Sequence, residues 1–224
     1  MIQYKQTGLY LVKLYWDRFI EKYAMPRPQT DAQQRILAIA DDLFYREGVR
    51  AIGVDTIIAR SEVAKTTLYR YFPSKDDLVV AYLEGRNQRF WELFEAVVSQ
   101  HLGQPKQQLL AIFAWIDELL SSDDSHGCPF LMVASEFPEP DYPGHQVAIA
   151  HKQKMRDRMT ELAELAEIRP AQELSAVLLM LADGAFAERR LFKQHHNGVS
   201  LVKAAATMIA AYETGLHESI EANR

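Results

Sequence analysis

Side chains able to bind nucleic acid gather between residues 65 and 70. Lys65, Thr66, Tyr69 and Arg70 supply two cations, a hydroxyl group and a phenol. Cations attract phosphates, while hydroxyl and phenol groups bond to phosphates or to base edges. The alternative is that these residues only form the solvated face of a surface helix. The combination of groups on one face favours the nucleic-acid interpretation.

The segment around those residues has the pattern of two short helices joined by a tight turn. Apolar residues recur with helical spacing on its other face, at Ala64, Leu68 and Phe72. An earlier helix would place Ile57, Ile58 and Ser61 inward, with Val63 in the turn. Residues 55–72 therefore predict a helix-turn-helix, which lays its second helix in the major groove of DNA.

The charge distribution favours a DNA-binding end on an otherwise acidic protein. The net charge of the 224-residue chain is −5, but the segment from Arg60 to Lys75 has four cations and one anion. From Trp91 onward, 11 Lys and Arg residues stand against 19 Asp and Glu residues, a balance of −8. Such a protein would dock its basic end on DNA and turn the acidic remainder away from it.

Composition excludes several other classes of protein. Apolar residues make up 48% of the chain, helix formers dominate, and no alternating run indicates a sheet, so we expect an all-α fold. Cys128 is the sole cysteine, which excludes an intramolecular disulfide and a thiolate metal cluster. No apolar run approaches the roughly 20 residues that span a membrane, and no signal-peptide pattern is present. We expect a cytoplasmic protein that does not span a membrane.

Residues 1–28 differ in composition from the rest of the chain, interleaving aromatic and aliphatic residues with cations. Tyr10 to Tyr23 could form an amphipathic helix that ends before Pro26 and Pro28. This N-terminal extension could be an extra helix packed on the body, or a basic arm touching DNA or a membrane surface. It could also be a translated leader with Met25 as the functional start, and the sequence leaves the three alternatives open.

Local signals mark the helices on either side of the helix-turn-helix. Thr30 begins one helix with a capping box, and Gly48 ends it. Ser74 and Asp77 begin a long helix that runs to Gly103 and would link a head to a separate body.

Lys75 lies at the N-terminus of that long helix, where the helix dipole and free amide groups favour an anion. A lysine at this position is unfavourable for the helix itself. A DNA phosphate would complete the site, so Lys75 strengthens the nucleic-acid interpretation.

The remainder of the chain predicts further helices separated by short breaks. Apolar residues have helical spacing in the stretches 109–120, 130–137, 145–166, 170–192 and 200–219. Prolines at 138, 140 and 143 predict a loop over 138–144. In the helix from His145 to Ala166 the expected inward residues are Val147, Ile149, Met155, Met159, Leu162 and Leu165. The last two helices suit close packing, within the chain or across a two-fold axis.

The segment from Thr30 to about Leu83 closely resembles the TetR/AcrR family of bacterial transcriptional regulators. The shared residues are Ile36, Leu43, Phe44, Gly48, Ile57, Val63, Lys65, Thr67, Leu68, Tyr69, Phe72, Ser74, Lys75 and Leu78. Beyond it, Gly-Cys-Pro-Phe-Leu at 127–131 and Glu-Phe-Pro at 136–138 resemble a recurring subgroup of that family.

The resemblance implies a ligand-responsive regulator that is not an enzyme and needs no cofactor. In the family a three-helix head binds a palindromic double-stranded operator as a homodimer, and the last two helices form the dimer interface. Residues 29–89 would be the DNA-binding domain, with the helix-turn-helix at 53–72. Residues 104–224 would bind the effector and dimerise. A small, partly apolar effector would release the repressor from its operator, and the bound protein would be associated with the bacterial nucleoid.

By position, the resemblance assigns DNA contacts to seven residues. They are Lys65, Thr66, Thr67, Tyr69, Arg70, Tyr71 and Lys75. The first four would approach bases or the adjacent backbone, Tyr71 and Lys75 would hold phosphates, and Arg70 would add a contact. Asp55 or Thr56 would touch the backbone from the first helix of the motif.

Two residues depart from the family pattern. Glu62 stands where the turn usually has glycine, so a left-handed conformation there would cost roughly 1 kcal/mol or more. Ala64 replaces the usual serine at the start of the recognition helix, which removes a capping bond worth about 1 kcal/mol. We therefore expect a head that loosens more readily than is usual for the family.

The body offers weaker functional signals. Trp115, Phe130 and Phe186 could line an effector pocket, although each also suits plain core. A helical enzyme or ligand carrier using that pocket is the main alternative, but the sequence shows no paired acid and base or nucleophile for it. A minor variant of this alternative is redox sensing through Cys128. The histidines lack partners at metal-ligand spacing, so we expect no metal site.

Overall fold

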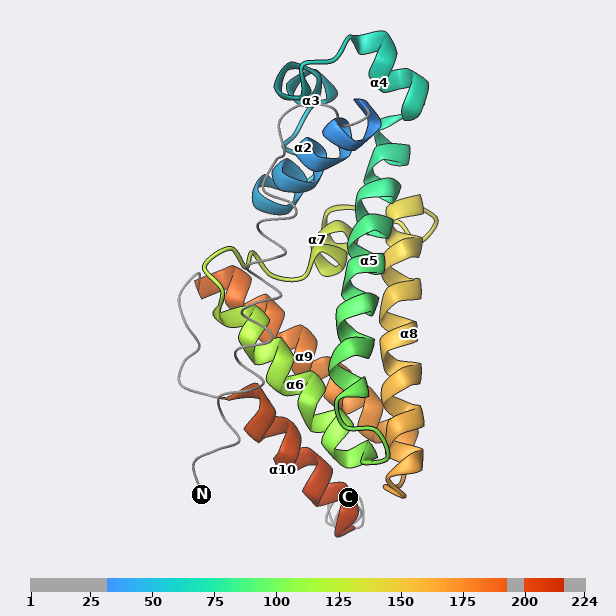
Figure 1. Cartoon of the computed structure of the whole chain (residues 1–224), viewed down its shortest axis with the longest axis vertical. Coiled ribbons are helices and arrows are strands. Elements are labelled where there is room, and N and C mark those ends of the chain that lie inside the picture. Colours follow the sequence, from blue (N-terminus) through green and yellow to red (C-terminus); the bar gives the residue numbers. More distant parts are fainter. Residues whose placement is uncertain (1–31, 193–199, 216–224) are drawn as a thin grey trace.

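The computed structural model describes residues 32–192 and 200–215, and every regular element in these ranges is a helix. This confirms the predicted all-α fold. Figure 1 shows three short helices at one end and a bundle of longer helices at the other. The expected helix from Tyr10 to Tyr23 and the cap at Thr30 lie outside the described residues. Among the helices described, none is both long and apolar enough to cross a bilayer.

The head is formed by α2 (Ala32–Glu47), α3 (Val54–Ser61) and α4 (Lys65–Tyr71). The three helices share one core because each carries apolar residues at helical spacing. Fully buried members of that core include Ile36, Ala40, Leu43, Phe44, Ile57 and Leu68. Gly48 ends α2 with a φ of 93°, as predicted, since glycine enters the left-handed region without steric penalty.

Helix α5 (Lys75–Ser99) joins the head to the body. The Asp77 backbone N–H donates to Ser74 Oγ at 3.0 Å, and the Ser74 backbone N–H donates to the Asp77 carboxylate at 2.9 Å. This reciprocal pair confirms the predicted capping box. Figure 1 shows α5 leaving the head and running beside α8 through the body, against which it packs.

The body consists of α6 (Pro105–Ser121), α7 (Pro129–Glu136), α8 (Pro143–Leu165), α9 (Ala171–Phe192) and α10 (Leu201–Glu213). Helix α8 is central, because it packs against α5, α6, α7 and α9. Helix α10 covers α6 and α9. The predicted end of the last helix, Ser219, lies outside the described residues.

Several expectations for the body are wrong in detail. Pro143 is the first residue of α8 instead of part of the preceding loop, because proline is tolerated in the first turn of a helix. Ile149 is 47% exposed and Leu165 is 62% exposed, although both were expected to face inward. Ile149 follows the buried Ala148 by one position, which turns it about 100° away from the packed stripe. Leu165 is the last residue of α8, and Phe192 at the end of α9 is likewise exposed.

Candidate functional site

Helices α3 and α4 form the predicted helix-turn-helix, and buried residues hold them together. Ile57 and Leu68 are fully buried, and Phe72 is nearly so. Ser61 is also buried, and its hydroxyl donates to the Ile57 carbonyl at 2.7 Å. The hydroxyl satisfies its bonding potential within α3, so it is tolerated in the core. The apolar sides of both helices are therefore fixed, which also fixes the orientation of their outer faces.

Helix α4 lies at the far end of the head (Figure 1), and its side chains form the expected polar face. Lys65, Thr66, Tyr69 and Arg70 are exposed. Thr67 and Tyr71 are half-buried at the sides of the helix. Leu68 and Phe72 are buried as the spacing predicts, but Ala64 is exposed instead of inward, because it is the N-cap residue and precedes the packed turns of the helix.

The cations of this face have weak partners within the protein. Lys65 Nζ lies 3.3 Å from Asp55 Oδ1, and both side chains are largely exposed. Exposed ion pairs of this kind contribute at most about 1 kcal/mol, so a phosphate can replace the carboxylate. The Arg70 guanidinium lies over the Tyr71 ring at 4.9 Å and donates to the Tyr71 hydroxyl at 3.3 Å.

Lys75 has an internal partner that the sequence did not reveal. Its Nζ donates to the Val49 carbonyl at 2.6 Å, so it ties the N-terminus of α5 to the loop between α2 and α3. Burial lowers the pKa of Lys75, although the nearby Glu136 and Asp76 carboxylates favour its charged form. A phosphate is thus not needed to explain a lysine at this helix start, because the Val49 carbonyl already occupies it.

The two departures from the family pattern have the expected local geometry. Glu62 follows α3 with φ 54° and ψ 40°, in the left-handed region. Ala64 is the N-cap of α4 and provides no side-chain hydrogen bond. The turn therefore contains a strained residue and the helix start lacks a capping acceptor.

Glu136, the last residue of α7, clamps the body to the loop between α2 and α3. Its carboxylate accepts hydrogen bonds from the backbone N–H groups of Val49 at 3.2 Å and Arg50 at 2.6 Å. A Cβ on Gly48 would lie 2.7 Å from the same carboxylate, so a side chain at this position would displace the Glu136 carboxylate. Sequence reasoning had noted Glu136 only within the Glu-Phe-Pro motif.

The residues just before α7 are hydrogen-bonded to Tyr45 of α2 in the head. The Tyr45 hydroxyl donates to the Gly127 carbonyl at 3.1 Å and accepts from the His126 backbone N–H at 3.0 Å. The Arg86 guanidinium lies 3.7 Å from the centre of the Tyr45 ring and forms two bonds to Asp41. The segment 126–136 is therefore attached to the head at both ends.

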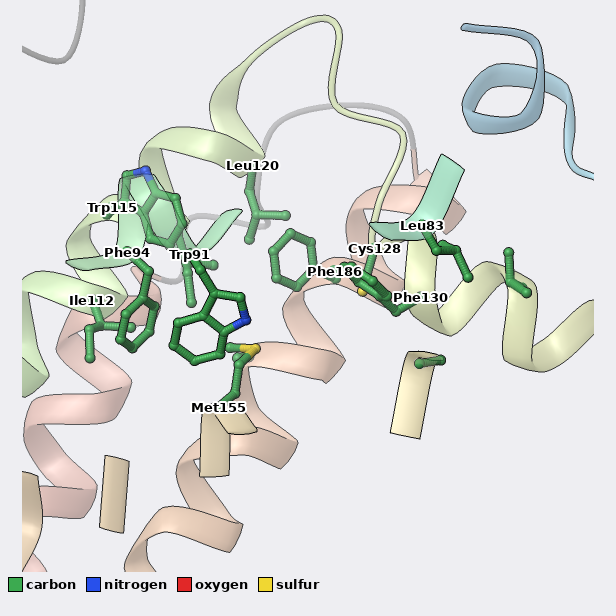
Figure 2. Close-up of a cluster of buried hydrophobic side chains, with 14 of the residues drawn as sticks. Leu83, Trp91, Phe94, Ile112, Trp115, Leu120, Cys128, Phe130, Met155 and Phe186 are labelled. Atoms are coloured by element: carbon green, nitrogen blue, oxygen red, sulfur yellow. The ribbon is translucent and has the colours of Figure 1, made fainter. Parts of the chain in front are cut away.

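The three aromatic residues predicted for an effector pocket are buried in one cluster of the body (Figure 2). A series of ring contacts connects two of them. Trp115 lies 5.2 Å from Phe90, Phe90 lies 4.7 Å from His151, and the His151 ring stacks on Phe130 at 3.7 Å. Phe186 lies in the same cluster, 5.9 Å from Lys152 Nζ. The Nε1 atom of Trp91, which sequence reasoning did not single out, is buried there without a hydrogen-bond partner.

Cys128 is buried beside Lys152. Burial alone would lower the pKa of Lys152, but Cys128 and the ion-paired Asp183 raise it. His151 is not placed as a metal ligand, since its Nδ1 lies 2.9 Å from Asn87 Oδ1. Over residues 32–192 and 200–215, no cluster of three or more metal-ligating side chains occurs.

Comparison with known proteins identifies relatives of the head and of most of the chain. Residues 36–82 match a family profile described as bacterial regulatory proteins of the tetR family. A TetR-family transcriptional regulator from Streptomyces coelicolor, SCO4454, is 31% identical. Its solved structure aligns over 84% of this chain and 95% of that one, with a TM-score of 0.67.

Two further relatives agree with these matches. A TetR-type regulator from Streptomyces avermitilis is 27% identical over 82% of this chain and 99% of its own, with a TM-score of 0.74. The HTH-type transcriptional repressor Rv3405c of Mycobacterium tuberculosis is 31% identical over 107 residues, which is 48% of each chain. These relatives are described as transcriptional regulators, which favours the DNA-binding interpretation over a helical enzyme or ligand carrier.

Proposed function

Because the chain belongs to the TetR family of transcriptional regulators, we propose that it is a repressor whose α4 helices read a palindromic operator and that a small molecule releases it. The exposed polar face of α4 carries this proposal, since it combines Lys65, Thr66, Tyr69 and Arg70 on a helix anchored by Ile57 and Leu68. A two-fold pair of such helices fits successive major grooves of a palindromic site.

The DNA-contacting residues of this proposal keep the roles expected from their positions. Lys65, Thr66, Thr67 and Tyr69 approach bases or the adjacent backbone, Tyr71 holds a phosphate, and Arg70 adds a further contact. Exposure of the Lys65–Asp55 pair supports this, because DNA can displace the carboxylate at little cost. A DNA phosphate that binds Lys75 must either replace the Val49 carbonyl or share the ammonium group with it.

We place the dimer interface on α9 and α10, within an effector-binding and dimerisation domain at 104–224. Helix α9 exposes a stripe of apolar and small residues, Met180, Gly184, Ala187 and Leu191, spaced by four, three and four positions. Met180 is 67% exposed and Leu191 is 73% exposed. Exposed apolar side chains on one helical face are typical of a surface that a second subunit covers.

Helix α7 provides the route from effector to operator in this proposal. Phe130 in its first turn stacks on His151 within the aromatic cluster, and Glu136 at its end holds the loop that leads into α3. An effector that favours a different position of Phe130 would therefore shift the head. Operator affinity would change by the difference in effector affinity between the two arrangements.

The test is equilibrium binding of the purified full chain to DNA from upstream of its own gene, at several salt concentrations. We expect binding that weakens with salt, and K65A should reduce the slope of log affinity against log salt by about 0.9 for one lost phosphate contact. If Lys65 reads a base instead, K65A weakens binding without that change in slope. R169A is the matched control, since Arg169 is an exposed cation in the connection between α8 and α9, far from α4 in Figure 1. Absence of binding at low salt, or equal effects of K65A and R169A, would contradict the proposal.

A further inference from the structure

Trp91 of α5 has a buried hydrogen-bond donor that no group of the described protein accepts. The side chain is 8% exposed, and its Nε1 atom is buried without a partner. An indole N–H can donate but cannot accept, so only an acceptor can satisfy it. Leaving such a donor unpaired costs free energy, so an external acceptor that reaches it gains affinity.

The surroundings of this donor are apolar and aromatic. Phe94 lies 4.8 Å from the Trp91 ring, and Met155 and Phe130 are buried in the same cluster. In Figure 2 the nitrogen edge of Trp91 faces away from Phe94 and Ile112, toward the side of the cluster that holds Phe186, Phe130 and Cys128. The donor is therefore directed into the cluster that includes the residues expected to bind an effector.

The two ionisable groups beside Phe130 and Phe186, His151 and Lys152, offer no unpaired charge to a ligand. Lys152 forms an ion pair with Asp183 and also contacts Cys128. His151 is neutral, because burial and the adjacent Lys152 and Lys154 lower its pKa to about 3. Lys154 is exposed and covers the outer face of Trp91 at 4.1 Å. A charged ligand that entered the cluster would lose its hydration shell, and no free counterion inside the cluster would compensate for that loss.

We propose that Trp91 Nε1 is the hydrogen-bond donor of the effector site, and that the effector is an uncharged, largely apolar molecule with an oxygen acceptor such as a ketone or ester carbonyl. This inference rests on the proposed function, since it names the chemical class of the small molecule that releases the repressor. Aromatic side chains supply contact area, and the single donor orients the ligand.

Three probes of similar shape test the proposal by calorimetry with the full-length protein. They are 2-acetylnaphthalene, 2-isopropylnaphthalene, which lacks the acceptor, and 2-naphthoate, which is an anion. We expect the acetyl compound to bind about tenfold more tightly than either of the others, as one satisfied buried donor implies. In W91F, which keeps an aromatic ring but no donor, the acetyl compound should lose that advantage while binding of the isopropyl compound is retained.

A second substitution separates the donor from general packing. W115F changes another tryptophan of the cluster. This variant should still prefer the acetyl compound over the isopropyl compound, even if it binds both probes more weakly. Thermal unfolding of W91F without ligand checks that the variant is folded. Equal binding of the acetyl and isopropyl probes, tightest binding of 2-naphthoate, no binding of any probe, or equal weakening of both probes in W91F would overturn the proposal.

Operator binding without probe is measured on the same samples. If the protein fails to bind DNA but shows the acetyl preference, the regulatory function is wrong and the ligand site stands. If it binds DNA and shows no preference, only the assignment of Trp91 fails.

Discussion

Glu136 Oε2 accepts a hydrogen bond from the Arg50 backbone nitrogen at 2.6 Å, which joins the last residue of α7 to the loop before α3. The same carboxylate accepts from Val49, whose carbonyl in turn accepts from Lys75. One side chain of the body therefore holds the backbone on which the orientation of the DNA-binding motif depends.

Removing this carboxylate should loosen the head. We expect E136A to lower the free energy of unfolding by about 1–3 kcal/mol, because two backbone donors lose a charged acceptor. Hydrogen exchange at the amides of Val49 and Arg50 should accelerate more than exchange in α9. E139A is the matched control, since Glu139 is exposed in the following loop. Unchanged protection of the two amides in E136A would show that the clamp does not operate.

Relieving the turn of the helix-turn-helix should have the opposite effect. Glu62 has a φ of 54°, so E62G should raise the free energy of unfolding by roughly 1 kcal/mol and remove an anion beside the proposed DNA surface. Operator affinity should rise as well. Glu167 has a φ of 59° in the connection after α8, so E167G should gain stability without a change in operator affinity. If E62G gains neither stability nor affinity, strain at this turn is not a cause of weakness.

Restoring the missing helix cap should stabilise α4. Ala64 has an extended backbone, with φ −69° and ψ 146°, which suits a capping serine. We expect A64S to add about 1 kcal/mol to the free energy of unfolding, measured by urea titration. A64V provides the control, because valine accepts the same backbone but offers no oxygen. Equal stability of the two variants would argue against a capping effect.

His151 should make stability depend on pH below neutrality. Burial, followed by Lys152 and Lys154, lowers its pKa in the folded state to about 3, against about 6.5 in the unfolded chain. The unfolded chain therefore binds the extra proton first, and the stabilising contribution present above pH 6.5 is lost as the pH falls toward 3. The limiting slope for one proton is about 1.4 kcal/mol per pH unit.

The measurement compares the wild-type protein with H151Q by urea denaturation between pH 7.5 and 5. Other titrating groups contribute equally to both proteins, so the difference isolates His151. We expect the advantage of the wild type over H151Q to shrink as the pH is lowered. A constant difference across this range would mean that the pKa of His151 is the same in the folded and unfolded protein.

Local features of this protein follow from its sequence because each depends on residues within a helical turn or two. Helical spacing from the buried Leu68 to the buried Phe72 places Lys65 and Tyr69 on the exposed face. The capping box at the start of α5 involves residues three apart, and the left-handed end of α2 follows from the conformational freedom of Gly48, whereas the left-handed Glu62 was expected only from the family resemblance. Such interactions need no knowledge of the fold.

Tertiary packing decided the contacts that connect these parts. Lys75 reaches Val49, 26 residues away, and Glu136 reaches Arg50, 86 residues away, so no local pattern predicts either bond. The same packing exposes Ile149 and encloses Trp91 Nε1 without an acceptor, because burial depends on which neighbouring helix covers each face. Helical periodicity was enough to predict the all-α fold and the polar face of α4. The contact between Glu136 and the loop after α2, and the unpaired N–H of Trp91, depend on which distant residues meet. They therefore became visible only in the packed arrangement of the helices.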